Sequence, residues 1–147
     1  MSYNHILVPV DGSQISFSAV RHAAEIAKQF NAQLSLISLV AEDPFTDVDF
    51  YYSSAIMKEY FVQAYQNAEK ALQEALKIAD DAGVSAQPKI TKGEVSAEGI
   101  VDAAKDLKAD LIVIGSHGNK GFKKFLLGSF AQDVLGSTEL PVMVIKA

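Results

Sequence analysis

Glycine and serine residues follow an apolar run in the last third of the chain. Gly115 and Gly118 come directly after Leu111–Ile114, and nine residues later Gly128 and Ser129 open a helical pattern. Glycine lets the main chain approach an anion closely. The first N–H groups of a helix have no intrahelical partner and lie at the positive end of its dipole. A strand, a glycine-rich loop and a helix start in this order predict a phosphate site, so we take this stretch as a candidate nucleotide site.

A second polar turn follows the first apolar run of the chain. Ile6–Val10 is predicted as a strand, and Pro9 lies near its end, where a missing N–H does little harm. Asp11, Gly12 and Ser13 then turn the chain. Asp11 is also of a type that caps turns by accepting backbone N–H groups, and this role stays open beside a ligand contact.

Periodicity predicts the elements that must position these turns. Strands are indicated by short branched apolar runs, and helices by apolar residues spaced three or four apart. Capping residues and glycines mark their ends, with Ser16 and Ser96 as N-caps and Asn31 and Gly83 as stops. In chain order the expected elements are strand Ile6–Val10, a helix from Ser16 to Asn31 with Val20, Ala23, Ala24, Ala27 and Phe30 inward, strand Leu34–Val40, helix Ala55–Ala82, strand Gln87–Thr91, a helix from Ser96 to Leu107, strand Leu111–Ile114, helix Ala131–Leu135 and strand Val142–Ile145.

Strands that alternate with helices predict an α/β fold with one parallel sheet. We expect an open five-stranded Rossmann-like sheet in the order 3-2-1-4-5, with helices on both faces. The crossovers after strands one and four then leave for opposite faces, and ligands bind at such a topological switch point. The segments Pro9–Asp11 and Gly115–Gly118 would meet in that crevice.

Composition sets the broad class. A chain of 147 residues predicts a single domain, residues 1–147. Thirteen basic and eighteen acidic side chains give a net charge of −5, which disfavours nucleic acid as a partner. No charged leader or run of membrane-spanning length occurs, so we expect no membrane insertion and a cytoplasmic location. Zero cysteines exclude a thiolate metal site, and no paired carboxylates indicate a metal site of another kind.

Catalytic motifs are missing. No phosphate-binding Gly-x4-Gly-Lys-Ser/Thr loop and no Gly-x-Gly-x-x-Gly after the first strand are present. His117 has no serine, cysteine or carboxylate visibly paired with it, so we expect it to pack near a ligand and predict no catalytic residue. Lys120, Lys123 and Lys124 either add charge near phosphates or form a solvated loop.

The two turns together resemble a known family. Gly115-Ser116-His117-Gly118, nine residues and Gly128-Ser129 match the Gly-x2-Gly-x9-Gly-Ser/Thr motif of ATP-binding universal stress proteins. The opening residues 6–13, Ile-Leu-Val-Pro-Val-Asp-Gly-Ser, resemble that family's first strand and turn. The resemblance covers essentially the whole chain and implies a fold like that of the adenine nucleotide alpha hydrolases.

The resemblance implies roles for particular residues. Asp11 would accept hydrogen bonds from ribose hydroxyls, while Val10 and Leu39 would flank adenine and present main-chain groups to it. Phe130 departs from the small or β-branched residue usual in the family, and its N–H would still serve a phosphate. The candidate cofactor-binding residues are Pro9, Val10, Asp11, Leu39, Gly115, His117, Gly118, Gly128, Ser129 and Phe130. The implied cofactor is ATP, with AMP and ADP as alternatives and Mg²⁺ brought by the nucleotide.

The last strand predicts a partner. Val142–Ile145 is an edge strand that begins after Pro141 and carries no charge, which leaves it open to pairing with another copy. Members of the family that the chain resembles commonly dimerise through this strand, so we expect a homodimer. The loop from Glu42 to Ser54 either covers adenine or contacts another subunit.

Three functions follow from these patterns. The leading hypothesis is a homodimeric regulatory protein of the stress response that binds ATP and changes its behaviour, or its unidentified protein partner, with nucleotide state. The second is a slow ATPase or an autophosphorylating phosphotransferase that uses the same site. The third is an interaction protein of this fold that binds no nucleotide, and the intact glycine pattern argues against it.

Overall fold

The structure is a computed structural model that describes residues 2–42, 55–118 and 127–146, with the backbone alone described at residues 55 and 56. The predicted loop after Glu42 lies outside the described residues, and so do Lys120, Lys123 and Lys124. Within the described helices, none combines the length and apolar character needed to cross a membrane.

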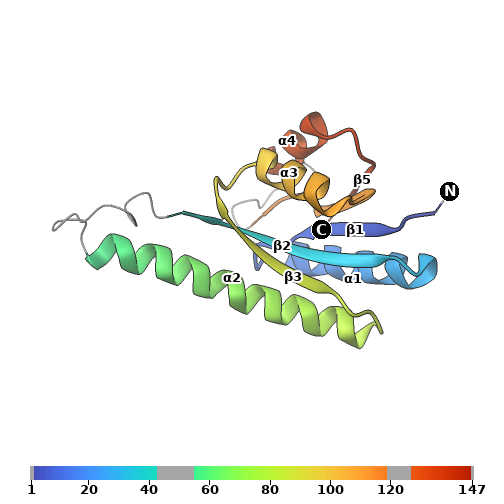
Figure 1. Cartoon of the computed structure of the whole chain (residues 1–147), viewed down its shortest axis with the longest axis horizontal. Coiled ribbons are helices and arrows are strands. Elements are labelled where there is room, and N and C mark those ends of the chain that lie inside the picture. The colour runs from blue at the N-terminus through green and yellow to red at the C-terminus, as the bar shows by residue number, and fades with distance from the viewer. Residues whose placement is uncertain (1, 43–54, 119–126, 147) are drawn as a thin grey trace.

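The described strands form a parallel sheet in the order β3-β2-β1-β4-β5, which confirms the predicted order (Figure 1). The central pairings are parallel, with Ile6 opposite Leu34 on one side and opposite Leu111 on the other. The strands are β1 (His5–Pro9), β2 (Gln33–Ala41), β3 (Gln87–Gly93), β4 (Leu111–Gly115) and β5 (Val142–Ile145), and the helices are α1 (Gln14–Phe30), α2 (Ala55–Asp81), α3 (Ala97–Leu107) and α4 (Ser129–Ser137).

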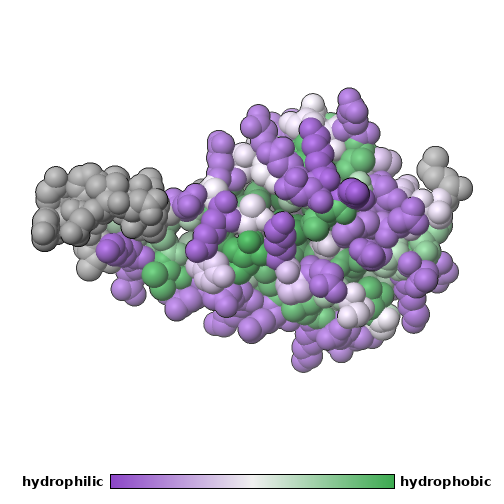
Figure 2. Space-filling model, viewed as in Figure 1, coloured by the Kyte–Doolittle hydropathy of each residue, from purple (hydrophilic) through white to green (hydrophobic). Residues whose placement is uncertain are grey.

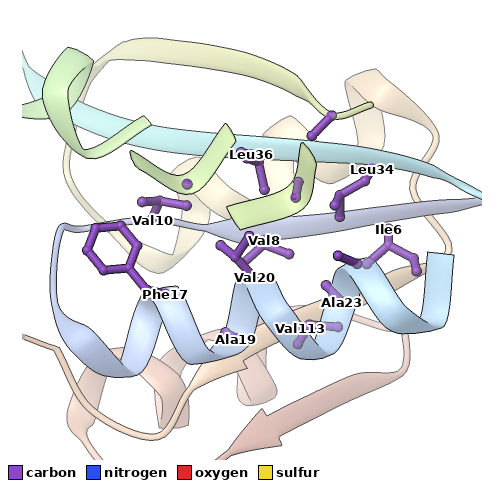
Figure 3. Packing of buried hydrophobic residues seen from close by; sticks show 14 of the residues in the cluster. Ile6, Val8, Val10, Phe17, Ala19, Val20, Ala23, Leu34, Leu36 and Val113 are labelled. Carbon is purple, nitrogen blue, oxygen red and sulfur yellow. The ribbon is translucent and has the colours of Figure 1, made fainter. Parts of the chain in front are cut away.

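Two cores, one on each face of the sheet, hold the helices in place. Because side chains alternate along a strand, Ile6 and Val8 of β1 face α1 and α2, while Leu7 faces α3 and α4. Figure 3 shows Val8 close to Val20 of α1 in the first of these cores. The helix after β1 and the helix after β4 therefore lie on opposite faces, which confirms the predicted switch point between these two strands.

Small residues allow the helices on the first face to pack closely. Ala23, Ala24 and Ala27 of α1 are at most 1% exposed, and Ala75 and Ala79 of α2 are fully buried. Opposite these stripes the helices carry polar side chains. Hydrophilic residues accordingly dominate the face shown in Figure 2, with smaller hydrophobic areas between them.

Two predictions for the first helix were wrong, its N-cap and the burial of Phe30. Ser13, not Ser16, is the N-cap of α1, because its backbone is extended and its Oγ accepts the Ser16 N–H at 3.2 Å. The Ser16 hydroxyl instead donates to the Ser13 carbonyl at 2.8 Å. Phe30, predicted to face inward, is 41% exposed and meets the ring of Tyr3 edge-on at the end of the helix.

Other boundaries differ by a few residues. β1 ends at Pro9 and leaves Val10 just beyond it, while β3 continues two residues past the predicted Thr91. The predicted caps Asn31 and Ser96 are confirmed, with Asn31 in the left-handed conformation that a helix C-cap requires.

Candidate nucleotide-binding crevice

Asp11 and Gly118 come together where β1 and β4 end side by side. A Cβ added at Gly118 would lie 2.7 Å from Oδ2 of Asp11, which is closer than real Cβ atoms approach. Residues 107 positions apart in the sequence are thus in contact, and their contact requires glycine at position 118. The two predicted loops do converge at the switch point.

The carboxylate of Asp11 is held by the turn that follows it. The Ser13 N–H donates to Oδ1 of Asp11 at 2.9 Å, and the Ser13 hydroxyl donates to the same oxygen at 2.5 Å. Gly12 adopts φ +83°, a conformation that lets the chain reverse between these residues. The turn-capping role considered for Asp11 is therefore present, and the carboxylate at the same time faces Gly118.

Gly115 and Gly128 are glycines because neighbouring atoms leave no room for a side chain. A Cβ at Gly115 would lie 3.0 Å from Cγ1 of Ile15 at the start of α1. A Cβ at Gly128 would lie 3.0 Å from the carbonyl oxygen of Ser116, to which the Gly128 N–H donates at 2.6 Å. A main-chain hydrogen bond thus holds the residue before α4 against the residue after β4.

The start of α4 presents its main chain. Gly128 is the N-cap, and Ser129 is the first helical residue. Gly128 has no side chain to accept from the first turn, which leaves the orphan N–H groups there to other acceptors. The Phe130 side chain is half-buried and packs against the core shared by α3 and α4, while Ser129 is exposed.

The two predicted adenine contacts, Val10 and Leu39, differ in whether their main-chain groups already have partners. Both main-chain groups of Val10 are engaged, because its N–H donates to Ile37 at 2.8 Å and its carbonyl accepts the Ser38 hydroxyl at 2.6 Å. By strand alternation the N–H and C=O of Leu39 point the same way as those of Ile37, toward the place where β1 has ended at Pro9. Leu39 therefore suits a main-chain contact better than Val10 does.

The side chains of these two residues pack into the two cores. Val10 is 3% exposed and belongs to the core under α1 and α2. The Cδ atoms of Leu39 pack against Gly99 of α3, where an added Cβ would lie 3.3 Å from Cδ2.

His117 has a serine neighbour that the sequence prediction missed. Its Nδ1 lies 3.1 Å from the Ser116 hydroxyl. Ser116 is 5% exposed, and its N–H donates to Ile145 of β5 at 2.8 Å. Such burial makes Ser116 a structural anchor for the loop, and His117 lies half-buried beside Gly128.

Three buried serines beside the candidate site have contacts that periodicity could not predict. Ser13, Ser38 and Ser116 are at most 9% exposed, and each follows or pairs with the end of a strand. A small hydroxyl within a buried apolar run or soon after it was the available signal, since buried hydroxyls need partners.

A groove of about 230 Å³ lies elsewhere, between β3 and α3. Lysines of β3 and carboxylates of α3 line it, Lys89 and Asp102 among them. None of its lining residues belongs to the predicted nucleotide site.

The sheet order and the two loops at its switch point define a doubly wound α/β protein of the Rossmann-like type. Comparison with known proteins narrows this class. The model of the universal stress protein family matches residues 2–146. The chain therefore belongs to the universal stress protein family.

Individual relatives agree with this assignment. Universal stress protein MJ0531 of Methanocaldococcus jannaschii is 36% identical over 144 residues, which are 98% of this chain and 82% of that protein. A universal stress protein solved in complex with cAMP is 26% identical with a TM-score of 0.75, covering 99% of this chain and 98% of that one. The universal stress protein from Archaeoglobus fulgidus in complex with dAMP is 25% identical with a TM-score of 0.75, covering 99% and 100%.

Proposed function

We propose that this chain is a homodimeric regulatory protein that binds an adenine nucleotide, ATP in the first place, between Asp11 and the glycines Gly115, Gly118 and Gly128. The observation that carries the proposal is the contact between Asp11 and Gly118 at the switch point. Two similar structures are complexes with cAMP and dAMP, which supports an adenine nucleotide as the ligand class.

The proposed binding mode assigns each end of the nucleotide to one side of the crevice. The carboxylate of Asp11 accepts from ribose hydroxyls, which are donors that a carboxylate binds strongly. The main chain of Leu39 meets the polar edge of adenine. The phosphates lie over Gly118 and the start of α4, where the N–H groups of Ser129 and Phe130 donate to them.

Mg²⁺ in this proposal arrives with the nucleotide. In the part of the chain that the structure describes, no group of three or more His, Asp or Glu side chains is arranged to hold a metal ion. Phosphate oxygens and water would supply most ligands of the ion, as is usual for Mg²⁺.

We place the dimer contact at β5 because the two edges of the sheet differ. β5 offers Val142, Met143 and Val144, of which Met143 is 38% exposed. The opposite edge, β3, carries a proline and lysines at exposed positions, features that discourage pairing. Pairing of two β5 strands would join the sheets of two copies.

Mass spectrometry of freshly purified, denatured protein tests the proposal, because a resident nucleotide is released and can be counted per chain. Near-stoichiometric ATP supports a sensor with slow or no hydrolysis. ADP or AMP together with steady phosphate release favours the second function, a slow ATPase or phosphotransferase. A chain that carries no nucleotide and ignores added ATP contradicts both.

A further inference from the structure

We infer that Ser13 is a positioning residue for nucleotide binding, which holds the Asp11 carboxylate in the orientation that a ribose requires. The inference rests on the proposed function, since it deepens the account of that same site. It assigns to a buried serine a role beyond the N-cap of α1.

Two donors of Ser13 converge on one oxygen of Asp11. The N–H and the hydroxyl of Ser13 both reach Oδ1, at 2.9 and 2.5 Å. Two donors on one oxygen favour a single orientation of the carboxylate, and in that orientation Oδ2 faces Gly118. Hydrogen bonds to an ionised acceptor are about twice as strong as neutral ones, which makes this restraint effective.

The Ser13 hydroxyl also has a second partner that fixes its direction. A hydroxyl has one proton, and because that proton goes to Asp11, its oxygen accepts from the Ser16 N–H at 3.2 Å. The same atom therefore ties the first turn of α1 to the carboxylate. The positive end of the α1 dipole further favours a negative charge at this place.

The difference in burial explains why positioning is needed. Asp11 belongs to the exposed residues, whereas Ser13 is 9% exposed. An exposed carboxylate without such an anchor would visit several rotamers, and binding would cost the entropy of fixing one of them. Ser13 fixes the rotamer of Asp11 when the chain folds, so this entropy is already lost before the nucleotide binds.

A purely structural role makes a different prediction, and the chain offers a matched control. Ser96 is the N-cap of α3, where its Oγ accepts the Gly99 N–H at 3.4 Å, and it lies outside the proposed site. Ser13→Ala and Ser96→Ala each remove an N-cap hydroxyl. Ser13→Ala alone also removes a donor to Asp11, and Ser13→Thr keeps a hydroxyl for both purposes.

The test is calorimetric titration of the full chain with ATP and Mg²⁺. We expect Ser13→Ala to weaken ATP binding roughly ten-fold, Ser13→Thr to restore most of the affinity, and Ser96→Ala to stay within about two-fold of wild type. Both alanine variants should lower the melting temperature. In the Asp11→Ala background, Ser13→Ala should cause no further loss of affinity, because the group it positions is gone.

Two outcomes overturn the inference separately from the function. If wild type binds ATP but Ser13→Ala and Ser96→Ala weaken binding equally, Ser13 is only a cap. If the losses of Asp11→Ala and Ser13→Ala simply add, the two residues act independently. A wild-type chain that does not bind ATP overturns the proposed function and this inference with it.

Discussion

The Gly128 N–H donates a 2.6 Å hydrogen bond to the carbonyl oxygen of Ser116, so the start of α4 is fixed to the residue that follows β4. The Ser116 N–H in turn donates to Ile145, the last residue of β5. The proposed phosphate site is thus built on main-chain contacts at the ends of β4 and β5.

Gly128→Ala should therefore cost both stability and nucleotide affinity. Its Cβ would lie 3.0 Å from the Ser116 oxygen and 3.2 Å from Cα of His117, both backbone atoms that cannot move alone. We expect a loss of about 1–3 kcal/mol in the free energy of unfolding, measured by urea denaturation.

Gly136→Ala is the matched control in the same helix. Nothing lies within 4 Å of its added Cβ, so we expect unchanged ATP affinity and a gain of up to about 1 kcal/mol from helix propensity. Equal behaviour of the two variants would contradict the packing role of Gly128.

Gly118→Val should abolish ATP binding and leave the fold intact. The Cβ added at Gly118 would meet only the Asp11 carboxylate, which is the end of a side chain. Turning the Asp11 side chain away therefore relieves this clash without moving the main chain. We expect wild-type circular dichroism, a melting temperature within a few degrees and no heat of ATP binding. Unchanged affinity would refute the placement of the nucleotide between these residues.

Gly115→Ala tests the contact between β4 and α1. The added Cβ would lie 3.0 Å from Cγ1 and 3.1 Å from Cγ2 of Ile15, so overpacking should destabilise the chain by about 1–3 kcal/mol. Ile15→Ala removes both of these atoms. The double variant should lose less stability than the sum of the single variants, and simple additivity would count against a direct contact.

The order of the sheet could be predicted from the sequence, because local apolar patterns indicate which segments are buried strands. The unbroken branched run of β4 is typical of a strand buried in a parallel sheet, and the alternation of strands and helices then limits the order of the sheet. The convergence of Asp11 on Gly118 followed from that order.

Two kinds of detail could not be predicted from the sequence. One is the choice between neighbouring residues for the same role, and the other is any contact that depends on the register of two strands. Ser13 and Ser16 are equally good capping types, and the turn at Gly12 decides which one has the extended backbone. The engagement of the Val10 N–H by Ile37 depends on the register of β1 against β2, which no residue type reveals. The Ser116 contact of His117 is likewise set by the loop geometry and not by spacing.

Asp11→Ala should remove the preference for ribose hydroxyls. We expect the variant to bind ATP roughly ten-fold more weakly than wild type does. Its affinity for 2′,3′-dideoxy-ATP should be close to that of wild type, because the lost acceptor served only the hydroxyls. Competition titrations with the two nucleotides measure the ratio. An equal loss for both nucleotides would place the carboxylate elsewhere relative to the ligand.

Met143→Lys should disrupt the proposed dimer. A charge on the exposed side chain at the centre of β5 opposes pairing with the same strand of a second copy. Val95→Lys is the control, since Val95 is 57% exposed and lies outside β5. Light scattering should give a monomer for the first variant and a dimer for wild type and control. A dimeric Met143→Lys chain would mean that another surface joins the copies.

The nucleotide content of freshly purified protein tests the central claim most directly. Wild type, Gly136→Ala and Gly118→Val are denatured side by side, and the released nucleotide is identified and counted per chain by mass spectrometry. We predict close to one adenine nucleotide per chain for the first two and almost none for Gly118→Val. Equal amounts in all three, or an empty wild-type chain that also ignores added ATP, would contradict a nucleotide site between Asp11 and Gly118.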